Sequence, residues 1–373
     1  MRYSVVSLSA LLRRTSAGVL SLCTLLGCGS GGTASTTTTS ANTNAYAAAY
    51  QKATFASGVT ASFPSSCSMT ITASGAPYSH QSYYLAPIGP NGGTVVATTP
   101  SGIQLMVVTY AQLSANNKAV SATFNICPNK ASTATSANGG AIGIIFSGTA
   151  LFNPYEATGT VALSDNASYT FTQNGTTYTA SFLDPCAQHT TGGGNMGGST
   201  WHYHGNPTCW TSVVDGSSSG PSHIIGIALD GFPIYGGRDI NGNVVDTATL
   251  DSCNGITSAT PEFPSGAYHY VLPITANGTA VQTSKSSLNC YSGTVNATLS
   301  AQMKKLACKI PMLLASGKMR LPDGHEVTPH EAMAWMHQTM PDMGPDMQMP
   351  GMVMASTGPE KKGLTRSHSM HGM

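Results

Sequence analysis

Two histidines separated by one residue, His202 and His204 in the segment WHYH, are the side chains best suited to chemistry in this sequence. On a β-strand, residues i and i+2 project from the same face, so both imidazoles could reach one metal ion. His189 precedes them across a glycine-rich segment that is flexible enough to bring a third imidazole close. Three histidines with an open position suit Cu²⁺ or Zn²⁺. We expect a metal site, although hydrogen bonding inside an aromatic core is the alternative.

Two carboxylates are candidates to support this site. Asp184 and Asp230 could accept a hydrogen bond from the far N–H of a ligating imidazole. A structural role is the alternative for each, because Asp230 stands in an Asp-Gly pair typical of hairpin turns and Asp184 recurs as Asp251 in a similar segment. No G-x-S-x-G, P-loop or H-E-x-x-H pattern is present, so the sequence leaves open whether the protein is an enzyme.

An internal duplication provides the elements that would position the histidines. GIIFSGTALFN at 143–153 aligns with GIALDGFPIYG at 226–236, and each has the apolar–turn–apolar pattern of a tight hairpin. LDPC at 183–186 aligns with LDSC at 250–253, an offset of 67 residues. We therefore predict a mainly β, sandwich-like domain built from two diverged copies of one β-hairpin-containing unit.

The 67-residue offset shows which histidines have a counterpart in the second copy and which do not. His202 aligns with His269, whereas His204 aligns with Val271 and His189 with Ile256. A purely architectural histidine would be kept in both copies, as His202 is. The two histidines found only in the first copy are therefore the better candidates for chemistry, with His269 as a further candidate ligand.

The N-terminal residues indicate an extracytoplasmic protein. Residues 1–28 resemble a bacterial lipoprotein signal peptide, with arginines before an apolar run too short to span a bilayer and a Leu-Leu-Gly-Cys ending at Cys28. Lipidation of Cys28 would anchor the chain in the outer membrane, facing the periplasm or the cell surface; ordinary secretion is the alternative. Residues 29–62 are rich in Ser and Thr and are expected to be a flexible linker, followed by the β domain at 63–300.

Cysteine content agrees with an oxidising compartment. Seven cysteines follow Cys28, so up to three disulfides would leave one thiol unpaired. Cys186 with Cys209 would brace the loop that carries the histidines, and Cys253 with Cys290 would do the same in the second copy. Sequence alone does not fix these pairings.

Residues 140–293 resemble the YHYH-domain family of extracytoplasmic proteins. The resemblance rests on HYHGNPTC, HIIGIALDGFPIYGG, LDSCNGI and PSGAYHYV, and it makes LDPCAQH the counterpart of the family's Asp-X-Cys-X-Gly-His element. The sequence departs from the family twice: Trp201 replaces the first Tyr of the name motif, and Gln188 replaces the Gly before His189. The resemblance implies a domain type and no settled activity.

Residues 301–373 form a Met/His-rich tail, predicted to contain a short helix and disordered segments. Thirteen of the seventeen methionines lie from Met303 onward. Thioether and imidazole ligands together suit copper, whereas a Met-rich surface for packing or promiscuous contact is the alternative. The candidate ligands are Met336, His337, Met340, Met343, Met347, His368 and His371.

These observations favour a lipid-anchored transition-metal-binding protein of the cell envelope. Copper is the expected ion and zinc the second choice. A metal-dependent extracellular enzyme, redox or hydrolytic, and a non-catalytic surface binding module are the alternatives. Charged residues make up 8% of the chain and the net charge is +1, which excludes an electrostatic nucleic-acid binder. The expected partners are the membrane and the metal ion, and nothing identifies a protein partner.

Overall fold

The computed structural model describes residues 45–89, 92–115, 117–137, 140–156, 158–190, 200–304, 306, 311–321 and 323–339. All of them belong to one compact unit that covers residues 38–373. The predicted signal peptide and several candidate residues lie outside these ranges: Cys28, Met340, Met343, Met347, His368 and His371. The side chain of His337 is not described either.

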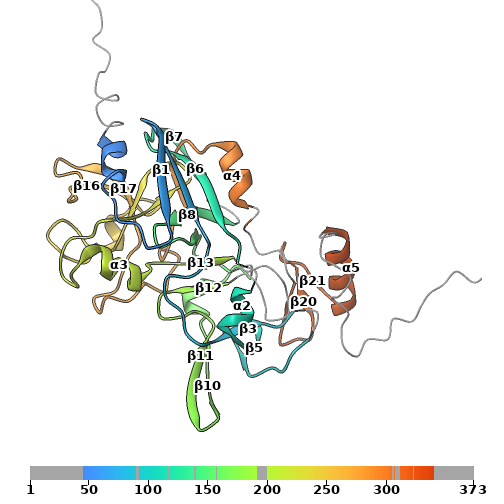
Figure 1. Cartoon of the computed structure of the whole chain (residues 1–373). Helices are drawn as coiled ribbons and strands as arrows, with labels where there is room; N and C mark the ends of the chain where they lie inside the picture. Colours follow the sequence, from blue (N-terminus) through green and yellow to red (C-terminus); the bar gives the residue numbers. More distant parts are fainter. Residues whose placement is uncertain are drawn as a thin grey trace, which may run out of the picture. The chain divides into compact units, whose positions relative to one another are not determined.

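An eight-stranded sheet dominates the fold, in agreement with the mainly β prediction (Figure 1). Its strands run in the order β12-β13-β9-β8-β14-β15-β17-β16. In the same order their bounds are Gln188–Thr190, Trp201–Tyr203, Ala150–Phe152, Ala141–Ile145, Ile224–Ala228, Pro233–Tyr235, Ala267–Val271 and Gly255–Ser258.

The sheet consists of two similar halves that meet at the antiparallel pair β8–β14. Ile144 pairs with Ile227 at the centre of this contact, and the flanking pairs are related by the same twofold exchange. At the outer edges, His189 pairs with His202 between β12 and β13, and Ile256 pairs with His269 between β16 and β17. The predicted duplication is therefore confirmed. We call the half with β8, β9, β12 and β13 copy one, and the half with β14 to β17 copy two.

The predicted hairpins β8–β9 and β14–β15 turn at Gly148 and Gly231. Their φ angles are 107° and 88°, a region that L-residues with a side chain rarely enter. Each glycine follows a small polar residue, Ser147 in copy one and Asp230 in copy two. The turn chemistry read from the sequence is thus the chemistry that reverses the chain.

A three-stranded sheet packs against the eight-stranded sheet. It contains β1 (Thr60–Ser65), β2 (Ser68–Ala73) and β6 (Val120–Asn125). The alternate residues Met69 and Ile71 of β2 are fully buried, and they share one apolar core with Ile144 of β8 and Ile227 of β14. Two sheets around one core make the sandwich-like layering that was predicted.

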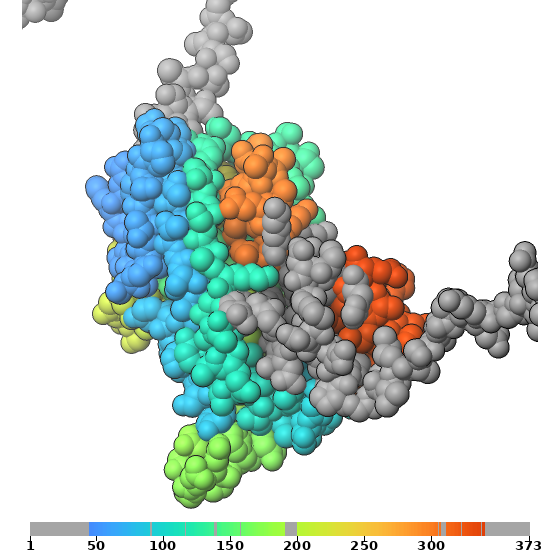
Figure 2. Space-filling view, turned by 45° about the vertical axis from the view of Figure 1, so that its right-hand side comes forward, coloured from blue at the N-terminus to red at the C-terminus, as the bar shows by residue number. Residues whose placement is uncertain are grey.

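Smaller elements surround this core. A five-stranded sheet has the order β10-β11-β3-β5-β4, and its β10–β11 hairpin projects from the fold (Figure 1). Helix α4 lies against β6 and β8 on the face shown in Figure 2. The bounds are β3 Tyr83–Pro87, β4 Ala97–Thr98, β5 Gln104–Thr109, β7 Lys130–Ser136, β10 Ser168–Gln173, β11 Thr176–Ser181, β18 Cys290–Gly293, α2 Tyr110–Ser114, α3 Thr208–Asp215 and α4 Ala297–Lys304, with 3₁₀ turns at Ala162–Ser164 and Thr247–Thr249.

The linker predicted over residues 29–62 extends too far. Residues 45–50 are helical, and β1 begins at Thr60. Tyr50 is fully buried and its hydroxyl donates to the Gly231 carbonyl at 2.8 Å, while the Tyr46 hydroxyl donates to the Tyr268 carbonyl at 2.9 Å. The low-complexity composition of this segment predicted a linker, although Tyr46 and Tyr50 are part of the core.

The region predicted as a tail begins with folded structure. Strands β19 (Met312–Leu313), β20 (Met319–Arg320) and β21 (Glu326–Val327) form a small sheet, and α5 (Pro329–Thr339) packs on it. The α5 helix fulfils the helical part of the prediction, whereas the three short strands were not anticipated. Within the described part of the chain, no helix is long and apolar enough to cross a membrane.

Three disulfides join Cys67 with Cys127, Cys186 with Cys209, and Cys253 with Cys290. The second and third confirm the two predicted pairings. Cys308 lies outside the described residues. Because disulfides persist in oxidising compartments, these three bridges indicate an extracellular or periplasmic protein.

Candidate metal centre

Three histidines of copy one converge, as the sequence predicted. His189 and His202 are cross-strand partners on β12 and β13, and His204 follows β13 directly. The Nε2 atom of His204 lies 3.0 Å from Nε2 of His202 and 3.1 Å from Nε2 of His189. All three side chains are buried, with exposed fractions of 1 to 5%. Among the residues that the structure describes, this is the one group of three or more side chains arranged to hold a metal ion.

Backbone carbonyls set the protonation of two of these rings. Nδ1 of His202 lies 2.9 Å from the Thr200 carbonyl, and Nδ1 of His204 lies 2.7 Å from the Asn153 carbonyl. A carbonyl only accepts hydrogen bonds, so in both neutral rings the proton is assigned to Nδ1 and the lone pair to Nε2. Two lone pairs therefore face each other across 3.0 Å without a proton between them. A bound cation would remove this repulsion.

Burial keeps the three imidazoles neutral. It lowers the pKa of His204 to about 4, and it holds the pKa values of His189 and His202 well below their usual value, with the neighbouring histidines adding to the effect. Neutral imidazole is the form that binds metal ions. The three histidines are therefore in their binding form at neutral and mildly acidic pH.

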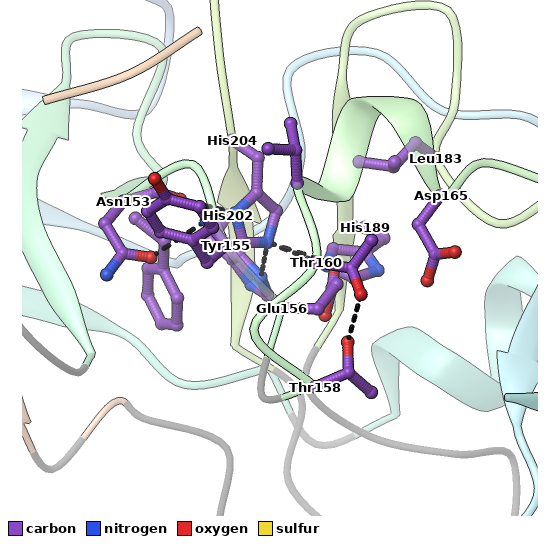
Figure 3. Close-up of polar contacts among 12 residues, drawn as sticks. Asn153, Tyr155, Glu156, Thr158, Thr160, Asp165, Leu183, His189, His202 and His204 are labelled. Atoms are coloured by element: carbon purple, nitrogen blue, oxygen red, sulfur yellow. Dashed lines mark hydrogen bonds and ion pairs between the residues drawn. The ribbon is translucent and has the colours of Figure 1, made fainter. Parts of the chain in front are cut away.

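A carboxylate that the sequence analysis missed completes the cluster. Oε1 of Glu156 lies 3.2 Å from Nε2 of His189 and 3.4 Å from Nε2 of His204 (Figure 3). Burial, with a smaller contribution from Asp165, raises the pKa of Glu156 to about 8. No motif marks this residue. The available signal was the hairpin alignment, which places Glu156 opposite Asp239 when it is continued past residue 153.

The separations between these donor atoms fit a small metal ion. Neighbouring ligands of a tetrahedral zinc site lie about 3.3 Å apart when the bonds are about 2.0–2.1 Å long. The four separations given above range from 3.0 to 3.4 Å. Three imidazoles and one carboxylate are also donors that Zn²⁺ and Cu²⁺ accept.

Aromatic rings hold the imidazoles in place. Phe152 of β9 stacks on His202 with ring centroids 3.9 Å apart, and Phe182 meets His189 edge-on at 4.6 Å. These contacts restrict rotation of both imidazoles about their side-chain bonds. The site is consequently preorganised by packing as well as by hydrogen bonds.

The predicted supporting roles of Asp184 and Asp230 are wrong. Backbone carbonyls accept the far N–H groups of His202 and His204 instead. Asp184 accepts from the backbone N–H groups of residues 186 and 188, and Asp230 accepts from the Tyr270 hydroxyl at 2.6 Å and from the Gly293 N–H at 2.8 Å. Both carboxylates order loops, which is the structural role the sequence left open.

His269 occupies the position in copy two that His202 occupies in copy one. Its Nδ1 lies 3.0 Å from the Ala267 carbonyl, and its ring lies 4.7 Å from that of Tyr235, the counterpart of Phe152. Ile256 pairs with it across the strands, where His189 pairs with His202. His269 is not a member of the described metal-ligand cluster, so we withdraw it as a candidate ligand.

In copy two, Gly255 and Tyr268 occur together for a steric reason. The Tyr268 hydroxyl donates to Oδ2 of Asp251 at 2.8 Å. It passes so close to Gly255 that a Cβ at that position would collide with it. Tyr268 and Gly255 are the counterparts of Trp201 and Gln188.

Copy one replaces both residues and supplies the hydroxyl from elsewhere. Trp201 has no hydroxyl, and Oδ2 of Asp184 instead accepts from Tyr84 of β3 at 2.9 Å. The space beside residue 188 is then free for a side chain, and the Gln188 amide donates to the Ser79 carbonyl at 2.6 Å. The two departures from the family pattern are thus one coupled substitution.

Of the tail candidates, only Met336 has a described side chain. It lies on α5 and is 4% exposed. This burial favours a packing role for Met336 over metal binding.

One family model matches this region of the chain. The model, described as YHYH protein, matches residues 121–244 and 238–284, which include the whole cluster and both copies. Searches of curated proteins and of solved structures found no match.

Proposed function

We propose that the chain is an extracytoplasmic transition-metal-binding protein, from the match of residues 121–284 to the YHYH family model and from the histidine cluster that they enclose. His189, His202 and His204 are the proposed ligands. The observation that carries the proposal is the pair of facing lone pairs on His202 and His204, each fixed by a backbone carbonyl on the far side of its ring. Ligating histidines commonly donate their other N–H in this way.

Copper is the proposed ion. For a site of given donors, affinity among divalent ions rises to Cu²⁺ and falls again at Zn²⁺. Neutral imidazoles suit both ions, so zinc is the main competitor. Burial of all three rings supports tight holding of the ion over turnover of a substrate, because catalytic metal sites keep an open position.

The Met/His-rich residues beyond Thr339 and Cys28 belong to the same proposal. Their methionines, which bind Cu⁺, would collect copper near the domain, and a lipid on Cys28 would keep the protein at the envelope. The support is composition and the lipoprotein-like motif. Both features lie outside the described residues.

Elemental analysis of the purified protein tests the proposal. The full chain, a chain ending at Thr339 and the variant His202→Ala would be exported to the periplasm, purified without chelators and analysed for copper, zinc, iron and manganese. We expect about one ion in the chain ending at Thr339, at least one in the full chain, and about one ion fewer in His202→Ala than in the full chain. His269→Ala is the matched control and should keep the ion. A full chain that binds no transition metal would reject the proposal.

A further inference from the structure

We infer that Glu156 is the fourth ligand of the histidine site, and that its carboxylate makes the site selective for a divalent ion over Cu⁺. The inference rests on the proposed function and deepens it. It assigns a donor set of three nitrogens and one oxygen, and it divides copper between two places: Cu²⁺ at the domain and Cu⁺ at the methionines of the tail.

Glu156 is buried, and its Oε1 atom faces the histidines. Its side chain is 9% exposed, and Oε1 has no hydrogen-bond partner among the described residues. Nε2 of His189 and Nε2 of His204 lie 3.2 and 3.4 Å from this oxygen. Nε2 of His204 carries a lone pair, so this atom and Oε1 of Glu156 can both coordinate one ion. An ion at the common centre satisfies all of these atoms together.

A tight turn delivers Glu156 to this position. The chain leaves β9, and Tyr155 bridges to Val161 while the Glu156 N–H donates to the Thr160 carbonyl at 2.9 Å. The backbone carbonyl of Glu156 accepts from the Gly159 N–H at 2.9 Å, which closes the turn. Figure 3 shows the side chain extending from this turn toward His204 and His189. The backbone hydrogen bonds thus fix the carboxylate without using it.

Copy two uses the same turn for a different purpose. Arg238 bridges to Val244, and the Asp239 N–H donates to the Asn243 carbonyl at 2.8 Å. Asp239 is one methylene shorter than Glu156, and its carboxylate accepts from the backbone N–H groups of Asn241 and Asn243. It therefore stabilises its own turn. The extra methylene of Glu156, together with a site lined by histidines, turns a structural carboxylate into a ligand.

The carboxylate determines which ions the site prefers. Its attraction to a bound ion scales with the ion's charge, so a divalent ion gains twice what Cu⁺ gains. Carboxylate oxygen is also a hard donor, which suits divalent ions, whereas Cu⁺ favours thioether and thiolate sulfur. Three imidazoles alone would accept either oxidation state, so Glu156 is the specificity-determining residue.

Metal titration of the full chain and its Glu156 variants tests the inference. Metal-free protein would be titrated with Zn²⁺ and with Cu²⁺ against a competing chelator. Glu156→Gln keeps the shape but removes the charge, and Glu156→Asp keeps the charge but withdraws the oxygen. We expect each substitution to weaken the binding of Zn²⁺ and Cu²⁺ by at least ~10-fold, because loss of a residue that only hydrogen-bonds to a metal ligand already weakens binding by about that much. Asp239→Asn is the matched control and should bind like the unaltered chain.

A displacement experiment separates oxidation states despite the methionines of the tail. Zinc-loaded protein would receive Cu⁺, supplied as its acetonitrile complex without oxygen, and released zinc would be measured after gel filtration. In the unaltered chain, the domain should keep its zinc while the tail binds Cu⁺. The Glu156→Gln variant should release most of its zinc. Circular dichroism would confirm that the variants are folded.

The outcomes are distinguishable. If the unaltered chain binds neither divalent ion, the proposed function fails and the inference falls with it. If the chain binds and Glu156→Gln binds equally tightly, only the fourth ligand is overturned. If Cu⁺ displaces zinc equally from both proteins, the selectivity is overturned.

Discussion

Copy one and copy two share a backbone and differ in what that backbone presents. The two halves have the same strand pairing, the same hairpin turns, a disulfide from the matching cysteines Cys186 and Cys253, and a matching Asp that orders the loop before the histidine strand. The differences at the site are three side chains: histidines in place of Ile256 and Val271, and Glu156 in place of Asp239. A metal site can thus be added to this framework without altering its strand pairing or its hairpin turns.

The largest expected contrast is between His202→Ala and His269→Ala, which remove equivalent imidazoles. Loss of a ligand should cost more than the ~10–100-fold that loss of an outer-shell partner costs. We therefore expect His202→Ala to lower affinity for Cu²⁺ and Zn²⁺ more than ~100-fold and His269→Ala to leave it unchanged. Isothermal titration of the two variants makes the comparison. Equal losses would show that both copies contribute to binding.

Removing the disulfide of each copy should separate stability from binding. The bridges close loops with sequence separations of 23 and 37 residues, so Cys186→Ala with Cys209→Ala, or Cys253→Ala with Cys290→Ala, should each cost about 3–4 kcal/mol of unfolding free energy. Only the first pair should also weaken metal binding, because Cys186 lies three residues before His189. Urea unfolding and metal titration measure the two effects. Equal loss of affinity in both variants would contradict the assignment of the site to copy one.

The buried pair at the hairpin turn is neutral in copy one and acidic in copy two. Ser147 meets the Tyr203 hydroxyl at 3.1 Å, whereas Asp230 meets the Tyr270 hydroxyl at 2.6 Å. Burial raises the pKa of Asp230 to about 6, above its value in the unfolded chain. The folded protein therefore holds this proton more tightly, and the stability that the group contributes below pH ~4 is lost as the pH rises to ~6.

Asp230→Asn should remove that dependence. A pKa shift of about two units corresponds to about 3 kcal/mol. As the pH rises from ~4 to ~6, the unfolding free energy of the variant should therefore increase by about this much relative to that of the unaltered chain. Urea unfolding of the metal-free proteins across this range checks it, with Asp239→Asn as a partly exposed control. A stability difference that does not change with pH would refute the prediction.

The smallest effect concerns the coupled substitution around Asp184. Tyr84→Phe should cost about 1–2 kcal/mol, because a buried carboxylate oxygen loses its donor. Adding Trp201→Tyr alone should not restore stability, since the Gln188 side chain occupies the place that the new hydroxyl needs. Adding Gln188→Gly as well rebuilds the copy-two arrangement and should recover part of the loss.

Thermal unfolding of the three variants provides the test. Restoration of stability by Trp201→Tyr without Gln188→Gly would show that the two departures are independent.

Much of the fold was predictable because local signals and internal repetition agree. The Ser-Gly and Asp-Gly turns, the matching Leu-Asp-X-Cys segments and the shared His-Tyr pair recur in the same order in both copies, and each reports a local backbone requirement. The linker boundary was not predictable, because the burial of Tyr46 and Tyr50 depends on contacts with residues far along the chain, such as their hydrogen bonds to the carbonyls of Tyr268 and Gly231. The strands β19 to β21 are two residues each, which is too short for a periodic signal.

For the site, the sequence by itself determined that His202 and His204 would project together, because alternation along a strand is a local property. It also marked the extra histidines of copy one, since the alignment with Ile256 and Val271 requires no structure. Only the tertiary structure decided that Glu156 joins them and that Asp184 and Asp230 do not. A carboxylate becomes a ligand or a loop support according to which atoms lie within about 3 Å of it, and those distances depend on how separate strands and turns pack.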